Sequence, residues 1–324
     1  GSYSVAVTQT DAAGNSSLAG APLTFTLDST APLSISTITA ITTDSGTGGD
    51  FITSDPTLAI SGSNSPLAAG EAVQISLDGG ANWQAVTQLA GTSWSFDNTG
   101  ATLADGVHSF QTRVIDGAGN TGAVSSQAVT IDTAGSTSTS SITAITTDSG
   151  TSPSDFITND STLAISGANS PLAAGEVVQV SLDGGTNWLA VTQLTGTSWS
   201  FDNTANTLSS GSHSFQTRVI DVAGNPGAVA SQAVQIDTTP PAATIAIGAI
   251  SDDNGIAGDF KTNDPSLVIS GTLGAMLGAG EKVQISLDNG ASWLDASGQP
   301  GAGTSWSHDA TATTLPDGSY TFRA

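Results

Sequence analysis

Residues 108–116 read HSFQTRVID, and the same nine letters return at residues 213–221. Apolar and polar side chains alternate within this stretch, which is typical of a β-strand with one face in a core. Two further stretches behave in the same way. GTSWSFDNT occurs at residues 91–99 and 196–204, and STITAITTDSG (36–46) returns one residue shorter as SITAITTDSG (141–150). The sequence is therefore a repeat of one strand-rich unit.

The length of the unit is that of a domain. Asp28, Asp132 and Asp237 occupy the same place in successive units and lie 104 and 105 residues apart. Solenoid and propeller repeats are much shorter, at roughly 20–50 residues, whereas a folded domain has about this size. We divide the chain into an N-terminal segment (1–27) that carries the last two strands of a preceding unit, repeat 1 (28–131), repeat 2 (132–236) and repeat 3 (237–324), which stops inside its sixth strand.

Turn residues interrupt the alternation often enough to predict short strands throughout. In repeat 1 the pattern predicts strands at 34–41, 57–61, 73–77, 83–89, 94–96, 109–115 and 125–131. Seven such strands in about 105 residues match an immunoglobulin-like β-sandwich, and no ten-residue segment has the 3.6-residue period of a helix. The predicted fold is all-β, with tandem immunoglobulin-like β-sandwich domains forming an elongated rod. The predicted core of repeat 1 is built around Trp83, Trp94, Phe96 and Phe110.

The charge balance excludes several partners. The chain has 5 Lys and Arg against 28 Asp and Glu, a formal net charge of −23. Such a surface repels nucleic acid and anionic lipid, and no apolar run is long enough for a membrane span. The chain has no cysteine, which excludes disulfides and thiol chemistry. An extracellular chain without disulfides needs another cross-link, and calcium can provide one.

Acidic residues recur at three places in the unit. The first, which we name the acidic loop, contains Asp44 with Asp50, Asp148 with Asp155, and Asp252 and Asp253 with Asp259. The second, the Asp–Asn turn, contains Asp11 with Asn15, Asp116 with Asn120, and Asp221 with Asn225. The third is the junction aspartate, which is Asp28, Asp132 or Asp237.

The expected topology brings these three places together at a domain junction. In an immunoglobulin-like sandwich the Asp–Asn turn lies where the chain enters its domain, and the acidic loop lies at the opposite end, facing the next domain. At the first junction, side-chain oxygens would then converge from Asp44, Asp50, Asp132, Asp221 and Asn225.

Clustered carboxylates repel one another unless a cation or protons intervene. Calcium takes six to eight oxygen ligands, so we predict calcium at the junctions. The competing interpretation is that Asp-x-Ala-Gly-Asn is only a tight turn. The predicted ligand set is Asp28, Asp44, Asp50, Asp116, Asn120, Asp132, Asp148, Asp155, Asp221, Asn225, Asp237, Asp252 and Asp259.

Nothing in the sequence indicates catalysis. SLDGGANW at residues 76–83, repeated at 181–188 and 286–293, resembles the Asp-box S-x-D-x-G-x-T-W of sialidases, a hairpin-stabilising device remote from their chemistry. There is no glycine-rich loop opening a helix, no histidine paired with a nucleophile and no His/Cys cluster. We predict that the chain is not an enzyme.

Four further stretches carry a resemblance to a family. DTTPP (237–241), DFITSD (50–55), LADGVHSF (103–110) and DGAGN (116–120) resemble the bacterial Ig-like repeats of giant type I secreted surface adhesins, the RTX and biofilm-associated class. The resemblance implies extracellular, non-enzymatic extender modules that hold an adhesive tip away from a bacterial surface, with calcium stiffening the junctions. It carries the junction ligands over to Asp44, Asp50, Asp132, Asp221, Asn225 and their equivalents. The partners would be neighbouring repeats, with a host-cell, matrix or glycan ligand elsewhere in the full protein.

The sequence departs from the family pattern at two places. Repeat 2 opens with DTAGS (132–136), without the prolines that would stiffen its linker. LSSG (208–211) stands where repeat 1 has LADG, so one acid is lost.

Two alternative functions remain open at this point. Residues 1–28 align with 211–237, and GSY at 318–320 matches residues 1–3. The chain is then either a window on a longer array or a self-assembling filament, in which the N-terminal strands of one chain complete repeat 3 of the next by strand donation. The other alternative is a carbohydrate- or protein-binding module, for which the insertion ASGQPGAG (296–303) is the candidate loop.

Overall fold

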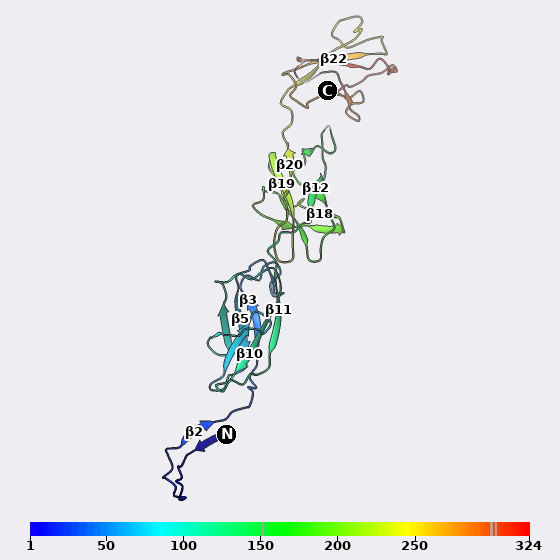
Figure 1. Ribbon diagram of the computed structural model, residues 1–324. Coiled ribbons are helices and arrows are strands. Elements are labelled where there is room, and N and C mark those ends of the chain that lie inside the picture. The colour runs from blue at the N-terminus through cyan, green and yellow to red at the C-terminus, as the bar shows by residue number, and fades with distance from the viewer. Residues whose placement is uncertain (151, 299–300, 302) are drawn as a thin grey trace. The chain divides into compact units, whose positions relative to one another are not determined.

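The computed structural model describes residues 1–150, 152–298, 301 and 303–324, and all regular structure in them is β (Figure 1). The predicted all-β class is confirmed. The contacts divide the chain into two compact units: Gly1–Thr146, Thr162–Thr207 and Ser212–Val234 form one, and Thr147–Ser161, Leu208–Gly211 and Gln235–Ala324 form the other.

Repeat 1 is a sandwich of two sheets. One sheet has the order β3 (Ser36–Ile41), β5 (Ala59–Asn64), β9 (Ser93–Asp97) and β8 (Thr87–Gln88). The other has the order β4 (Ile52–Thr53), β11 (Ser125–Ile131), β10 (Gly106–Ile115), β6 (Ala72–Ser76) and β7 (Gln84–Ala85). Inward residues alternate with outward ones along β5, where every second side chain is buried.

Repeat 2 has the same two sheets in the same order. The first contains β12 (Ser140–Ile145), β14 (Ala164–Asn169), β18 (Ser198–Asp202) and β17 (Thr192–Thr195). The second contains β13 (Ile157–Thr158), β20 (Ala230–Ile236), β19 (Gly211–Ile220), β15 (Val177–Ser181) and β16 (Leu189–Ala190).

The two ends of the chain have fewer strands. Repeat 3 contains the sheet β21 (Ile245–Ile250), β22 (Val268–Leu273) and β25 (Ser305–Asp309), and a pair made of β23 (Gln284–Ile285) and β24 (Leu294–Asp295). The N-terminal segment is a hairpin of β1 (Ser2–Val5) and β2 (Leu23–Thr26).

The structure differs from the predicted strands of repeat 1 in two ways. The strand expected at 83–89 is two strands in different sheets, because β7 pairs with β6 whereas β8 pairs with β9. The strand β4 was not predicted. It is two residues long, it follows Phe51, which has a positive φ of 62°, and it pairs in parallel with β11. A two-residue strand held by a distant partner leaves no periodic signal.

The core contains only part of the predicted aromatic set. Trp94 and Phe110 are fully buried, as are Trp199 and Phe215 in repeat 2. Trp83, by contrast, lies outside the core. Its indole Nε1–H donates to the carbonyl of Gly80 at 2.9 Å, and the guanidinium of Arg113 covers its ring at 4.0 Å. The prediction of Trp83 as a core residue was wrong, because Trp83 precedes β7, a two-residue strand at the edge of its sheet.

A tryptophan packed on a glycine forms the centre of each sandwich. Gly62 of β5 pairs with Trp94 of β9, and a Cβ added at Gly62 would overlap the indole of Trp94 and the carbonyl of Thr37. Gly167 with Trp199 and Gly271 with Trp306 repeat the arrangement. The glycine is therefore required for space, since a methyl group there has no room.

Substitution Gly167→Ala should lower the free energy of unfolding by about 1–3 kcal/mol, because overpacking displaces Trp199. The measurement is the urea midpoint followed by tryptophan fluorescence. Gly196→Ala in the same repeat is the control, because its new Cβ meets no atom within 4 Å. Equal midpoints for the two variants would contradict the packing argument.

Candidate functional site

The acidic loop has the same unusual backbone in every repeat. In repeat 1 it runs from Thr43 to Phe51, and both residues have positive φ, 51° and 62°. The equivalent residues are Thr147 and Phe156 in repeat 2, and Asp252 and Phe260 in repeat 3, all with φ between 52° and 61°. Positive φ is costly for threonine and phenylalanine, and such strain is concentrated at functional sites.

Side-chain hydrogen bonds hold the loop in this conformation. The Thr53 hydroxyl donates to the carbonyl of Thr43 at 2.5 Å, and the backbone N–H of Ser54 donates to Ser45 Oγ at 2.7 Å. The threonine bond recurs from Thr158 to Thr147 and from Thr262 to Asp252. The loop's own hydrogen bonds therefore hold this conformation without a ligand.

The first acid of each loop has one carboxylate oxygen without a hydrogen-bond partner. Asp44 Oδ2 accepts the backbone N–H of Gly49 at 2.7 Å, whereas Asp44 Oδ1 is buried and receives no donor from any described residue. Asp148 Oδ1 and Asp253 Oδ1 are in the same state. A buried anionic oxygen without a partner is costly, and a cation beside it would remove that cost.

The equivalence of the loops changes the assignment in repeat 3. Asp253 Oδ2 accepts the N–H of Gly258 at 2.7 Å, as Asp44 accepts that of Gly49. Asp252 instead takes the place of Thr43, with its positive φ and its carbonyl bonded to Thr262. Asp253 is therefore the counterpart of Asp44, whereas the predicted ligand set names Asp252 at this place.

The second acid of each loop caps the backbone that follows it. Asp50 Oδ1 accepts the N–H of Ile52 at 2.9 Å, and Asp155 and Asp259 accept in the same way. Asp259 also lies 3.6 Å from the exposed Lys261 ammonium. Among the described residues, no three His, Cys, Asp or Glu side chains are grouped closely enough to hold a metal. The predicted convergence of several carboxylates is not present in this structure.

The Asp–Asn turn uses its carboxylate internally. Asp116 Oδ1 accepts the N–H groups of Ala118 and Asn120, both at 2.9 Å, and Asp116 Oδ2 accepts the Asn120 side-chain amide at 2.8 Å. The side-chain bond from Asn120 is the main cause that holds the pKa of Asp116 below its ordinary value. Asp11 with Asn15 and Asp221 with Asn225 form the same turn. This geometry favours the tight-turn interpretation for the turn aspartates.

The same asparagine ties the turn to the chain entering the domain. Asn120 Nδ2 donates to the carbonyl of Asp28 at 3.2 Å, and Asn225 Nδ2 donates to that of Asp132 at 2.7 Å. The junction aspartates Asp28, Asp132 and Asp237 also accept the N–H two residues on. The asparagine side chain therefore ties the turn to the chain that enters the domain.

The acidic loop of repeat 1 contacts the Asp–Asn turn of repeat 2. The Ser45 hydroxyl donates to the carbonyl of Ala223, and a Cβ added at Gly46 would overlap the carbonyl of Val222. Both segments belong to the same compact unit. The structure thus brings the acidic loop next to the turn of the following repeat, as the topology predicts, but through backbone and hydroxyl contacts.

The Asp-box is a self-contained hairpin clamp. In repeat 2, Asp183 Oδ1 accepts the N–H of Asn187 at 2.9 Å and the hydroxyl of Ser181 at 2.7 Å, and Asp183 Oδ2 accepts the Asn187 amide at 2.6 Å. These bonds lower the pKa of Asp183 from 3.8 to about 2, and the bond from the Asn187 backbone N–H has the largest effect. Asp78 and Asp288 show the same shift. The clamp thus consists of hydrogen bonds within one turn.

The lowered pKa of Asp183 predicts a pH dependence of stability. Because the folded pKa is below the unfolded one, the stabilising contribution is complete above about pH 4 and is lost as the pH falls through about 2. The urea midpoint of the parent protein should therefore fall more between pH 5 and pH 2.5 than that of an Asp183→Asn variant. An identical fall in both proteins would show that the clamp does not stabilise the fold.

The remaining sequence candidate is the insertion at 296–303. Residues 299, 300 and 302 of this stretch lie outside the described residues. The described Ser297 pairs with Ser307 through an isolated bridge, so the start of the insertion is attached to β25.

No described helix is long and apolar enough to cross a membrane.

Comparison with known proteins gives a family match. The model of the bacterial Ig-like domain matches residues 32–133 and 136–238, more than half of the chain. Among solved structures, a tetra-tandem repeat from the extending region of a large adhesion protein shares 22% identity over 99% of this chain and 76% of that one, with a TM-score of 0.24.

Two further structures are ice-binding adhesins. A Ca²⁺-stabilized adhesin of an Antarctic bacterium shares 23% identity over 99% of this chain and 80% of that one, with a TM-score of 0.36. A 1.5-MDa bacterial ice-binding adhesin shares 19% over 87% and 88%, with a TM-score of 0.32. A search of curated proteins finds no match.

Proposed function

Because the chain belongs to the bacterial Ig-like domain family, we propose that it is a non-enzymatic extender of a bacterial cell-surface adhesin. In this proposal the repeats act as spacers, calcium at the domain junctions stiffens them, and the adhesive ligand is bound elsewhere in the full protein. The location would be extracellular, at the cell surface, with a role in cell adhesion and biofilm formation.

The recurrence of one unsatisfied oxygen carries the calcium part of the proposal. The same loop presents a buried, unpartnered carboxylate oxygen at Asp44, Asp148 and Asp253. An isolated defect in one repeat would indicate little, but three equivalent positions indicate a common ligand. The unpartnered atom is an anionic oxygen on a preformed loop, and hard cations such as calcium prefer oxygen ligands.

Several residues could complete the calcium shell at the first junction. Asp44 Oδ1 and the second acid, Asp50, come from the acidic loop, and the Asp–Asn turn of repeat 2, with Asn225 and the junction Asp132, adjoins that loop through Ser45. Backbone carbonyls and water would supply the remaining oxygens. Asp148 and Asp155 in repeat 2, and Asp253 and Asp259 in repeat 3, are the corresponding loop ligands. When bound, calcium neutralises the buried charge and links adjacent domains.

The spacer role follows from the repetition of whole domains. Repeats 1 and 2 have the same sheets, the same turn clamps and the same tryptophan–glycine centre. Near-identical copies of a complete fold add length without adding a new surface, which suits a spacer better than a catalyst. A repeat that binds the adhesive ligand would need a region that differs from the other repeats.

The Asp44→Asn variant separates a calcium ligand from a turn former. Without calcium, this substitution removes a buried unpaired charge, so the melting temperature in EDTA should rise or stay the same. With a few millimolar calcium, where extracellular modules of this kind are saturated, the parent should gain stability and the variant should gain less.

Calorimetric titration of the same proteins should show one calcium fewer bound by Asp44→Asn. Glu71→Gln removes an equal charge away from the acidic loop and is the matched control. Equal calcium stoichiometry and equal calcium-dependent melting in all three proteins would remove calcium from the proposal.

Small-angle X-ray scattering tests the stiffening directly. In a few millimolar calcium the scattering should be that of a rigid chain, and in EDTA it should become that of a chain with flexible linkers, because calcium restricts the junctions. The linker at 132–136, which has no proline, should make this change large. Scattering curves that coincide in calcium and in EDTA would contradict the mechanism.

A further inference from the structure

A glutamate closes the same turn in every repeat. The three residues, at intervals of 105, are Glu71, Glu176 and Glu281. In each of them the carboxylate oxygen Oε2 accepts the backbone N–H of the residue three positions earlier, at 2.9, 2.7 and 2.7 Å. The turn itself therefore accounts for one hydrogen bond of this side chain.

In repeat 2 the glutamate has two further partners. The Ser136 hydroxyl donates to Glu176 Oε1 at 2.5 Å, and the Ser138 hydroxyl donates to Glu176 Oε2 at 2.6 Å. Both serines belong to the linker that enters repeat 2, and they are 40 and 38 residues away from Glu176 in the chain. The carboxylate thus ties the linker to the body of the repeat.

The three donors keep Glu176 ionised. Partial burial by itself raises the pKa of this carboxyl, but the hydroxyls of Ser136 and Ser138 and the N–H of Ala173 together hold the pKa below its ordinary value. Hydrogen bonds to an ionised acceptor are roughly twice as strong as those between neutral groups. The contact is therefore made with a charged carboxylate at neutral pH.

The linker also lies close against the Asp–Asn turn of repeat 2. A Cβ added at Gly227 would lie 2.5 Å from the carbonyl oxygen of Ser136, and one added at Gly135 would lie 2.6 Å from that of Pro226. The N–H of Ser138 donates to Ser136 Oγ at 3.1 Å. The position of Ser136 is thus fixed through its hydroxyl while its carbonyl faces a glycine.

Repeats 1 and 3 have a proline where repeat 2 has Ser136. The residue lies four positions before β3, β12 or β21, and the two prolines are Pro32 and Pro241. In repeat 1, Ser34 is the counterpart of Ser138, and its hydroxyl donates to the carbonyl of Pro66 at 3.3 Å. Proline fixes its own φ near −65°, so the linkers of repeats 1 and 3 are restricted without a carboxylate.

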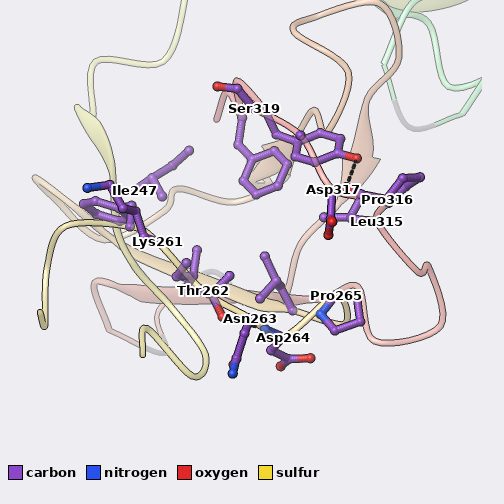
Figure 2. A pocket seen from close by; sticks show the side chains of 16 residues that line it. Ile247, Lys261, Thr262, Asn263, Asp264, Pro265, Leu315, Pro316, Asp317 and Ser319 are labelled. Carbon is purple, nitrogen blue, oxygen red and sulfur yellow. Dashed lines mark hydrogen bonds between the residues drawn. The ribbon is translucent and has the colours of Figure 1, made fainter. Parts of the chain in front are cut away.

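Repeat 3 shows that the glutamate lies near this place even where it has no hydroxyl to bind. Glu281 lines a cavity of about 310 Å³ together with Pro241 and Ala243, the counterparts of Ser136 and Ser138. Proline and alanine have no hydroxyl to donate. The larger cavity of repeat 3, of about 760 Å³, lies by Thr262 and Leu315 and includes none of these three residues (Figure 2).

We propose that Glu176 is a positioning residue that straps residues 136–138 onto repeat 2, in the role that proline has in repeats 1 and 3. The strap consists of hydrogen bonds, whereas proline restricts the backbone covalently. The entry of repeat 2 can therefore be released, and that of repeat 1 cannot. Glu176 is not among the calcium ligands named above, so the strap acts without calcium and can fail while the spacer function stands.

A spin label on the linker tests the strap, because the chain has no cysteine of its own. Thr137 is exposed and lies between the two serines, so a nitroxide on Thr137→Cys reports the motion of the linker without replacing a strap residue. Electron paramagnetic resonance in EDTA should show a slow label in the parent. Glu176→Ala should shorten its rotational correlation time, because the linker loses its anchor.

The matched control is the same pair of changes in repeat 1. Leu33→Cys carries the label at the counterpart of Thr137, a 95% exposed residue, and Glu71→Ala removes the same turn bond. The motion of this label should not change, because Pro32 holds its linker. An equal change at both labels would mean that only the turn is affected, and would overturn the proposal.

Two further variants separate the strap from the stability of the turn. The double substitution Ser136→Ala, Ser138→Ala leaves the bond from Ala173 to Glu176 in place and should loosen the label at 137 as much as Glu176→Ala does. Circular dichroism should show the repeats still folded in every variant. An unchanged label in the double variant would show that the hydroxyls do not hold the linker.

Rescue by proline completes the test. Ser136→Pro gives repeat 2 the residue of repeats 1 and 3, so the label at 137 should stay slow whether position 176 is glutamate or alanine. If Glu176→Ala still loosens the label in the Ser136→Pro background, the strap does not stand in for proline and the proposal is refuted.

Discussion

The contact of one indole with one glycine organises each sandwich. The chain is poor in aromatic residues, at 5%, so few side chains are large enough to fill the space between two sheets about 10 Å apart. A fully buried tryptophan fills much of it, and it can lie there only because the paired residue on the neighbouring strand has no Cβ. The three pairs are Gly62 with Trp94, Gly167 with Trp199, and Gly271 with Trp306.

This shared centre explains why the loops are alike. When strands of identical register surround the same indole, the connections between them start and end at the same points. The acidic loop accordingly has positive φ at both ends in all three repeats, and it buries the same carboxylate oxygen without a partner. Positive φ at threonine and phenylalanine and a buried carboxylate oxygen without a partner are both costly. The loop is therefore a more informative feature than the acidic composition.

The sandwich also depends on its last two strands, which close the core from one side. β10 and β11 supply Phe110, Val129 and Ile131, all of them buried.

The sequence by itself determined the all-β class, the length of the unit and most strands, because alternation and turn residues are local signals that recur in every copy. It also identified which acids recur. The tertiary structure alone decided that residues 83–89 divide between two sheets, that β4 pairs in parallel with β11, and that Trp83 lies under Arg113 outside the core. It likewise placed Asp253 at the position of Asp44 and left one oxygen of each unpaired. These features depend on backbone dihedrals and on partners distant in the chain, which no local pattern encodes.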